Sequence, residues 1–177
     1  MDYDSFTVDE ILSRVEEYSY QHLVLTGGEP LLHQTKLVPL LSRLKSKGFF
    51  VEVETNGTIA PAPETVELVD CFNVSPKTSN SDVPAGIRHR PDALKALIGT
   101  TKAWFKFVVC APADLIEIGK MISELGIPHD RVILMPEGTD STELAARGKW
   151  VTEACIANGY RFSPRLQILL FGDRRGT

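Results

Sequence analysis

Apolar segments of two kinds alternate along almost the whole chain, and this alternation constrains the fold more than any other feature. Short apolar runs alternate with longer stretches in which apolar residues recur at the spacing of an amphipathic helix. We predict strands at 23–25, 49–53, 72–74, 104–109, 132–134 and 160–162, and helices after Thr7 and at 37–44, 63–69, 113–125 and 141–158. Such an order requires parallel strands joined by right-handed crossovers. The sequence therefore predicts an α/β barrel, a partial barrel or an open doubly wound sheet.

Two segments stand outside this pattern. Residues 78–91 are rich in Ser, Pro, Gly and Asn without periodicity, which predicts a long loop of a kind more often functional or mobile than structural. The chain also opens on a predicted helix, so we expect the first strand of the architecture to be absent. With 177 residues, of which 43% are hydrophobic, we predict a single domain over residues 1–177.

Charge and hydropathy narrow the classes of partner. A formal charge of -4 and a pI near 5.6 disfavour a nucleic-acid-binding surface. No apolar run approaches the roughly 18 residues that a membrane-spanning helix needs, so we predict no membrane partner. The three cysteines lack the spacing of a disulfide framework, which is typical of a reducing compartment. We predict a cytoplasmic protein.

Four polar motifs each follow directly on a predicted strand. They are Thr26-Gly27-Gly28-Glu29-Pro30, Glu54-Thr55-Asn56-Gly57, Ser75-Pro76-Lys77 and Met135-Pro136-Glu137-Gly138. Because the carboxyl ends of parallel strands share one edge of a sheet, we expect all four motifs at that edge. Barrels and open α/β sheets place their active sites there.

The first motif has the chemistry of a ligand loop. Two glycines allow a sharp turn and close approach of a ligand to the main chain, and Glu29 offers a carboxylate to an ammonium group. The loop is neither G-x-G-x-x-G nor a Gly-Lys-Ser/Thr phosphate loop, so a phosphate cradle is disfavoured. Taken alone, each motif is also compatible with an ordinary turn at the end of a strand.

Taken together, the motifs resemble the radical S-adenosylmethionine (SAM) superfamily, and within it the 7-carboxy-7-deazaguanine synthases. The ending from Cys155 to Gln167 is also similar to that family, so the resemblance covers about residues 7–177. It implies a partial TIM-type βα barrel of mostly parallel strands. It also implies a radical SAM lyase of queuosine and 7-deazapurine biosynthesis, in which a 5′-deoxyadenosyl radical abstracts hydrogen from 6-carboxy-5,6,7,8-tetrahydropterin and the ring contracts to 7-carboxy-7-deazaguanine.

The resemblance also implies site residues. The implied cofactor-binding residues are Gly27, Gly28 and Glu29 at the methionyl amino group, Ser75, Pro76 and Lys77 at the ribose and carboxylate, and Met135, Pro136, Glu137 and Gly138 beside the adenine. The implied substrate-binding residues are Thr26, Glu54 and Asn56. Lys106 either reaches this site or only lines the barrel. Arg165, Arg174 and Arg175 either attract a carboxylated pterin or are simply solvated.

One element of the resemblance has no counterpart in this sequence. The family holds a [4Fe-4S] cluster with Cys-x3-Cys-x2-Cys, and a Thr or Ser beside the last of these cysteines binds Mg2+. The only cysteines here are Cys71, Cys110 and Cys155. We assign no metal ligand and no catalytic residue, and expect a chain shortened at its N-terminus and inactive alone.

Three hypotheses remain open at this stage. The first is the synthase, with a pterin substrate, an electron donor and a homodimeric state implied by the family. The second is an activating enzyme that forms a glycyl radical on a partner protein, because such enzymes share Gly-Gly-Glu-Pro. The third is a cluster-less, non-catalytic paralogue that uses the barrel to bind a ligand or a partner.

Overall fold

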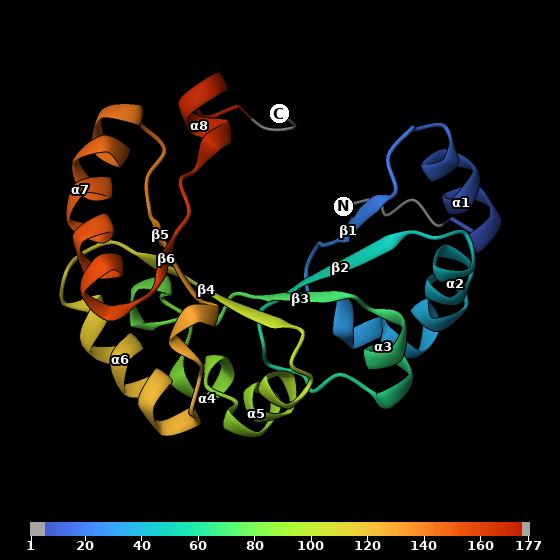
Figure 1. Ribbon diagram of the computed structural model, residues 1–177, viewed down its shortest axis with the longest axis horizontal. Coiled ribbons are helices and arrows are strands. Elements are labelled where there is room, and N and C mark those ends of the chain that lie inside the picture. Colours follow the sequence, from blue (N-terminus) through green and yellow to red (C-terminus); the bar gives the residue numbers. More distant parts are fainter. Residues whose placement is uncertain (1–5, 175–177) are drawn as a thin grey trace.

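The computed structural model describes residues 6–174, which form one parallel six-stranded sheet with helices packed against it (Figure 1). Each strand lies beside the strand that precedes it in the chain. Successive right-handed crossovers then all step in one direction, which places their helices on one face and curves the sheet. A doubly wound sheet instead reverses its strand order. The fold is therefore α/β, and the sheet is a partial TIM-type barrel. The strands are β1 (His22–Leu25), β2 (Phe50–Thr55), β3 (Cys71–Val74), β4 (Ala103–Val109), β5 (Val132–Pro136) and β6 (Arg161–Phe162).

The helices cover the outer, convex side of the arched sheet, and its concave side is open (Figure 1). A short terminal helix stands beside α7 at the rim. The helices are α1 (Val8–Glu16), α2 (Gln34–Ser46), α3 (Pro63–Leu68), α4 (Ala85–Arg88), α5 (Pro91–Gly99), α6 (Asp114–Leu125), α7 (Ser141–Asn158) and α8 (Leu166–Phe171), with 3-10 turns η1 (Pro30–His33), η2 (Ser79–Ser81) and η3 (His129–Arg131).

Local signals set the helix ends. Thr7 and Glu10 form a capping box at the start of α1, with each side chain bonded to the other residue's backbone N–H. Asp140 caps α7 by accepting from two backbone N–H groups, and Gly159 ends that helix at a φ of 71°. Helix α2 ends at Ser46, with Lys47 as its C-cap. Every predicted strand and helix is present, with bounds shifted by a few residues.

The two faces of the strands differ in polarity. Most side chains on the convex face are apolar and buried under the helices, as for Val51, Phe72 and Phe107. Alternate residues on the concave face, including Glu52 and Lys106, are only partly buried. Because successive strand residues point to opposite faces, each strand contributes both to the core and to an open polar surface.

The segment predicted as a loop at 78–91 contains more structure than expected. It includes η2 and α4, and its Pro91 is the first residue of α5, a helix that we did not predict. Proline is favoured at this position because its missing N–H has no partner there in any helix. Helix α8 was not predicted either. In residues 6–174 no helix is long and apolar enough to cross a membrane. The single-domain organisation stays a prediction.

Candidate active site

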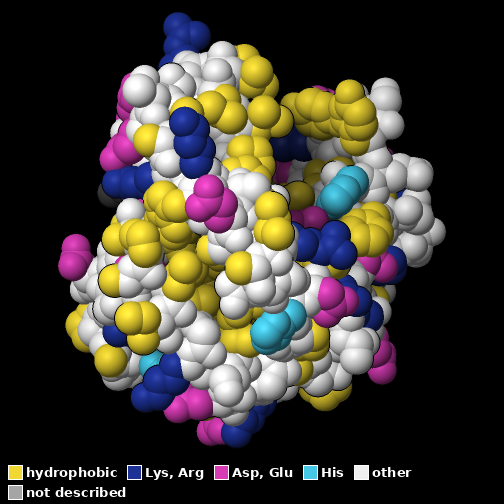
Figure 2. Space-filling model, turned by 60° about the vertical axis from the view of Figure 1, so that its left-hand side comes forward, with side chains coloured by type: hydrophobic (Ala, Val, Ile, Leu, Met, Phe, Trp, Pro, Cys, Tyr) yellow, Lys and Arg dark blue, Asp and Glu magenta, His cyan; other side chains and the backbone are white. Residues whose placement is uncertain are grey.

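A cleft of about 340 Å³ lies on the concave side, at the carboxyl ends of β1 to β5. Most of the residues predicted for the site line it, and they come from three of the four motifs and the first residue of the fourth: Thr26, Gly27, Gly28, Glu54, Asn56, Ser75, Lys77 and Met135. Figure 2 shows a hollow, rimmed by hydrophobic side chains, that also contains charged side chains. The structure thus brings together residues that are more than a hundred positions apart in sequence.

The glycine pair leaves the main chain open to a ligand. Gly27 has a φ of 115°, a conformation that side chains with a Cβ rarely adopt. A Cβ added to either Gly27 or Gly28 would meet nothing within 4 Å. The loop therefore presents its backbone to the cleft, and its contact with a ligand stays a prediction.

Glu29 lies behind this loop and faces the protein. Its side chain is almost fully buried, at 8% exposure, and its carboxylate accepts hydrogen bonds from the Thr55 hydroxyl at 2.8 Å and from the backbone N–H groups of Asn56 at 2.8 Å and Leu31 at 3.1 Å. These bonds join the Gly-Gly loop to the end of β2. The predicted contact between Glu29 and the ammonium group of a ligand stays a prediction.

Glu54 is held in the cleft by two neighbours. The Thr26 hydroxyl donates to its Oε2 at 3.1 Å, and the Lys106 ammonium lies 3.4 Å from its Oε1. Lys106 therefore reaches the site, which settles one of the alternatives left by the sequence. The side chain of Asn56 instead accepts from the backbone N–H and the hydroxyl of Thr58, so it stabilises its own turn while lining the cleft.

A second polar layer lies beneath Glu54. The Glu52 carboxylate contacts His22 at 3.2 Å and accepts from the Asn73 amide at 3.2 Å. The Asn73 carbonyl oxygen is shielded from solvent and has no hydrogen-bond partner within residues 6–174. Asn73 lines the cleft, and our sequence analysis missed it. Its signal was a polar residue between two buried apolar residues of one short strand.

A second cleft of about 300 Å³ continues from the first, since the two share Ser75, Lys77, Val108 and Arg165. Pro76 and Glu137 line this second cleft. Pro136 instead lines a groove beside α7, and Gly138 accepts a hydrogen bond from Arg165 through its carbonyl at 3.2 Å. The fourth motif is therefore divided among neighbouring surfaces.

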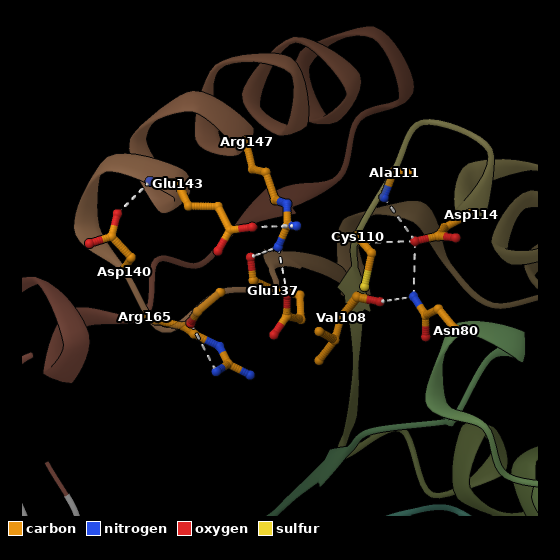
Figure 3. A network of polar contacts seen from close by, with 11 residues as sticks. Asn80, Val108, Cys110, Ala111, Asp114, Glu137, Asp140, Glu143, Arg147 and Arg165 are labelled. Atoms are coloured by element: carbon orange, nitrogen blue, oxygen red, sulfur yellow. Dashed lines mark hydrogen bonds and ion pairs between the residues drawn. The ribbon is translucent and has the colours of Figure 1, made fainter. Parts of the chain in front are cut away.

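Ion pairs and hydrogen bonds fix the side chains around the second cleft (Figure 3). Arg147 reaches from α7 to the Glu137 carboxylate at 2.5 Å and to Glu143 at 2.7 Å. Across the cleft, the Asn80 amide donates to Asp114 at 2.9 Å. Burial raises the pKa of Asp114, but this bond and those from the backbone N–H groups of Cys110 and Ala111 outweigh burial and lower the pKa overall.

The segment 78–91 is attached to α6 through one further carboxylate. Glu117 accepts from the Ser79 hydroxyl at 2.6 Å and backbone N–H at 2.9 Å, and pairs with Arg88 at 2.7 Å. Burial raises the pKa of Glu117, but the Ser79 bonds and the Arg88 charge lower it overall. This segment, which we expected to be functional or mobile, is therefore fixed beside the second cleft.

The three cysteines do not fit an iron–sulfur cluster. Cys71 begins β3, Cys110 follows β4 and Cys155 lies in α7. Burial raises the pKa of each thiol, and nearby carboxylates add to this at Cys71 and Cys110. Cluster ligands are thiolates, which need the opposite environment. Among the described residues, no group of three or more His, Cys, Asp or Glu side chains could hold a metal ion.

The three arginines that the sequence offered as possible pterin contacts differ in their position. Arg165 lines both clefts. Arg174 lies beyond α8 and lines neither cleft. Arg175 is outside the described residues.

Comparison with known proteins identifies the class of this fold and site. The model of the radical SAM superfamily matches residues 1–147, so the chain belongs to that superfamily. The chain is 38% identical to the 7-carboxy-7-deazaguanine synthase of Halobacterium salinarum, over 98% of this chain and 74% of the relative. It is also 38% identical to the synthase of Pyrobaculum aerophilum, over 96% and 74%. Within the superfamily, the chain belongs to the 7-carboxy-7-deazaguanine synthase family.

Solved structures agree with the fold. QueE from Escherichia coli matches with a TM-score of 0.66 at 24% identity, over 90% of this chain and 64% of that chain. A domain of pyruvate-formate lyase-activating enzyme from Bacteroides vulgatus matches with a TM-score of 0.57 at 15% identity, over 80% and 97%. At these identities the matches show a shared fold alone, so the second match does not favour the activating-enzyme hypothesis.

Proposed function

We propose that the two joined clefts bind SAM and a pterin in a 7-carboxy-7-deazaguanine synthase, which converts 6-carboxy-5,6,7,8-tetrahydropterin to 7-carboxy-7-deazaguanine. The observation that carries this proposal is the convergence of motifs from β1, β2, β3 and β5 on one open polar cleft. Family membership supports the choice of reaction.

The chemistry of each side chain matches a part of these ligands. The exposed backbone at Gly27 and Gly28 suits the methionyl end of SAM, and the Ser75 hydroxyl and Lys77 ammonium suit its ribose and carboxylate. Glu54 is an acceptor held between Thr26 and Lys106, which suits the N–H groups of a pterin. Glu29 acts from behind by fixing the loop that carries the glycines.

The cluster needs ligands that this sequence does not contain. The chain has three cysteines, and their positions do not fit a [4Fe-4S] cluster. We therefore propose that this chain does not assemble the cluster and is inactive alone. The same proposal includes Mg2+, an electron donor and a homodimeric, cytoplasmic state for a cluster-bearing form of the enzyme.

A reconstitution experiment tests the proposed function. The chain would be prepared anaerobically with iron and sulfide, alone and fused to a Cys-x3-Cys-x2-Cys segment from a relative. We expect product by mass spectrometry from the fusion only, and loss of product with Glu54→Gln. Product or stoichiometric cluster from the chain alone would contradict the proposed inactivity.

Two controls identify the remaining outcomes. Replacing the three cysteines of the fused segment by Ala must abolish product. An intact cluster on the fusion without product would contradict the synthase, and SAM binding by that same fusion would then favour the non-catalytic paralogue.

A further inference from the structure

Arg165 occupies the junction of the two clefts. It lies between β6 and α8, and its side chain lines both cavities. Its Nη1 donates to the Gly138 carbonyl at 3.2 Å, whereas its Nε is shielded from solvent and donates to no partner within residues 6–174. Figure 3 shows its guanidinium directed away from α7, unlike Arg147, which reaches from that helix.

The edge of this guanidinium opposite Gly138 has a defined chemistry. Nε and Nη2 present two parallel N–H groups, which match the two oxygens of a carboxylate. The bond to Gly138 fixes the orientation of the group but leaves that edge without a partner in the described chain. A purely structural role for Arg165 accounts for the bond of Nη1, but not for this edge.

Charge at the junction points to the same class of ligand. Glu54 is paired with Lys106, and Glu137 with Arg147. Lys77 and Arg165 line both clefts, and neither forms an ion pair with a carboxylate in the described part of the chain. Two cations without a counter-charge favour an anionic ligand where the clefts meet.

We infer that Arg165, together with Lys77, forms a carboxylate-binding site at this junction and that Arg165 grips the carboxylate side-on through Nε and Nη2. The identity of the ligand rests on the proposed function. Under that function the carboxylate has two sources, the amino-acid end of SAM and the 6-carboxyl group of the pterin. The same edge of Arg165 binds either one.

Calorimetric titration of the cluster-free chain tests the inference with two ligand pairs. The pairs are SAM with decarboxylated SAM, and 6-carboxypterin with pterin. We expect Arg165→Gln to weaken binding of one carboxylated ligand by at least about tenfold and to leave its decarboxylated counterpart unchanged. The affected pair identifies the source of the carboxylate.

Matched variants separate the effect of the paired N–H groups of Arg165 from the effect of its positive charge. Arg165→Lys keeps the positive charge but loses the two parallel N–H groups, so it should keep only part of the wild-type affinity. Lys149→Gln removes one positive charge from the exposed face of neighbouring α7, outside both clefts, and should change none of the four affinities. Unfolding midpoints and amide NMR spectra establish that each variant is folded. If Arg165→Gln does not fold, the wild-type Arg165 Nε–H resonance should still shift with one carboxylated ligand only.

Three results would overturn the inference. They are an equal loss for both members of a pair, no loss for any ligand, and a wild-type chain that binds neither carboxylated ligand better than its counterpart. The proposed function fails separately, through the absence of product from the cluster-bearing fusion. If the fusion forms no product but still binds the ligand in a carboxylate-dependent way, the synthase is refuted and the Arg165 site stands.

Discussion

Neighbouring residues of the same strand face two different environments in this protein. On the convex face of β4, Phe105 and Phe107 are 1% and 0% exposed under the helices. Between them, Lys106 points to the concave face and pairs with Glu54. The convex positions are constrained by close packing and the concave ones by ligand chemistry. Substitutions at adjacent positions should therefore have separable effects on stability and on binding.

The largest expected difference between the faces is in β4. Phe107→Ala leaves a cavity in the core and should lower the free energy of unfolding by about 3–5 kcal/mol. Lys106→Met removes a partly exposed ion pair and should change it by less than about 1 kcal/mol. Urea unfolding of both variants measures this difference. Similar losses for the two variants would contradict the division between the faces.

A pair of glycines tests how tightly the strand ends pack against the core. At Gly57, φ is 76° and an added Cβ would lie 2.6 Å from Leu94 and 2.9 Å from Val74. At Gly48, φ is 81° and an added Cβ would meet nothing within 4 Å. We expect Gly57→Ala to cost about 2–4 kcal/mol and Gly48→Ala about 1 kcal/mol, because both are strained but only the first is overpacked. Equal costs in thermal unfolding would show that the contacts at Gly57 relax.

Glu29 connects the loop of the concave cleft to the end of β2. Glu29→Gln keeps the shape of the side chain but replaces a carboxylate oxygen that accepts hydrogen bonds by an NH2 donor. It should cost about 1–3 kcal/mol of stability. The control Glu67→Gln, at an exposed position of α3, should stay within about 0.5 kcal/mol. A loss of stability no larger than that of the control would contradict this structural role of Glu29.

The smallest expected effect concerns the segment 78–91 and depends on pH. The pKa values of Asp114 and Glu117 lie below their ordinary values of 3.8 and 4.5 in the folded chain. Their contribution is therefore fully present above those ordinary values and is lost as the pH falls through the lowered ones. The protection factors for amide exchange, which correct for the intrinsic pH dependence of exchange, should fall in residues 78–91 in this acid range. Asp114→Asn with Glu117→Gln should remove most of that pH dependence, and an unchanged dependence would exclude these two carboxylates as its cause.

The sequence predicted the parts of the fold that depend on periodicity. Phe105 and Phe107 lie on either side of the polar Lys106 in an otherwise apolar run, and α7 has an N-cap and a C-terminal glycine, so burial and capping determined these elements locally. Strand order was not predictable, since an alternating chain fits both a barrel and a doubly wound sheet. The observed order, in which each strand pairs with the next one in the chain, identified the partial barrel.

The sequence predicted the site residues that belong to polar motifs. It missed the features of the site that depend on how the strands pack together. Thr26, Glu54 and Ser75 lie in polar runs after strands, which is visible in the sequence. Asn73 lies alone between two buried apolar residues of β3 and belongs to no motif, so it was missed although it lines the cleft. The inward direction of Glu29 was not visible either, because its partners at the end of β2 are distant in sequence.

The central claim is that the concave cleft, and not another cavity, binds SAM. The larger groove of about 620 Å³ between α7 and α8 provides the contrast, since it is lined by residues such as Leu144, Phe162 and Leu169. Titration of the isotope-labelled chain with SAM, followed by amide NMR, tests this directly. The account predicts saturable shifts at Gly27, Gly28, Ser75 and Lys77. Shifts confined to the α7–α8 groove, or no shifts at millimolar SAM, would contradict it.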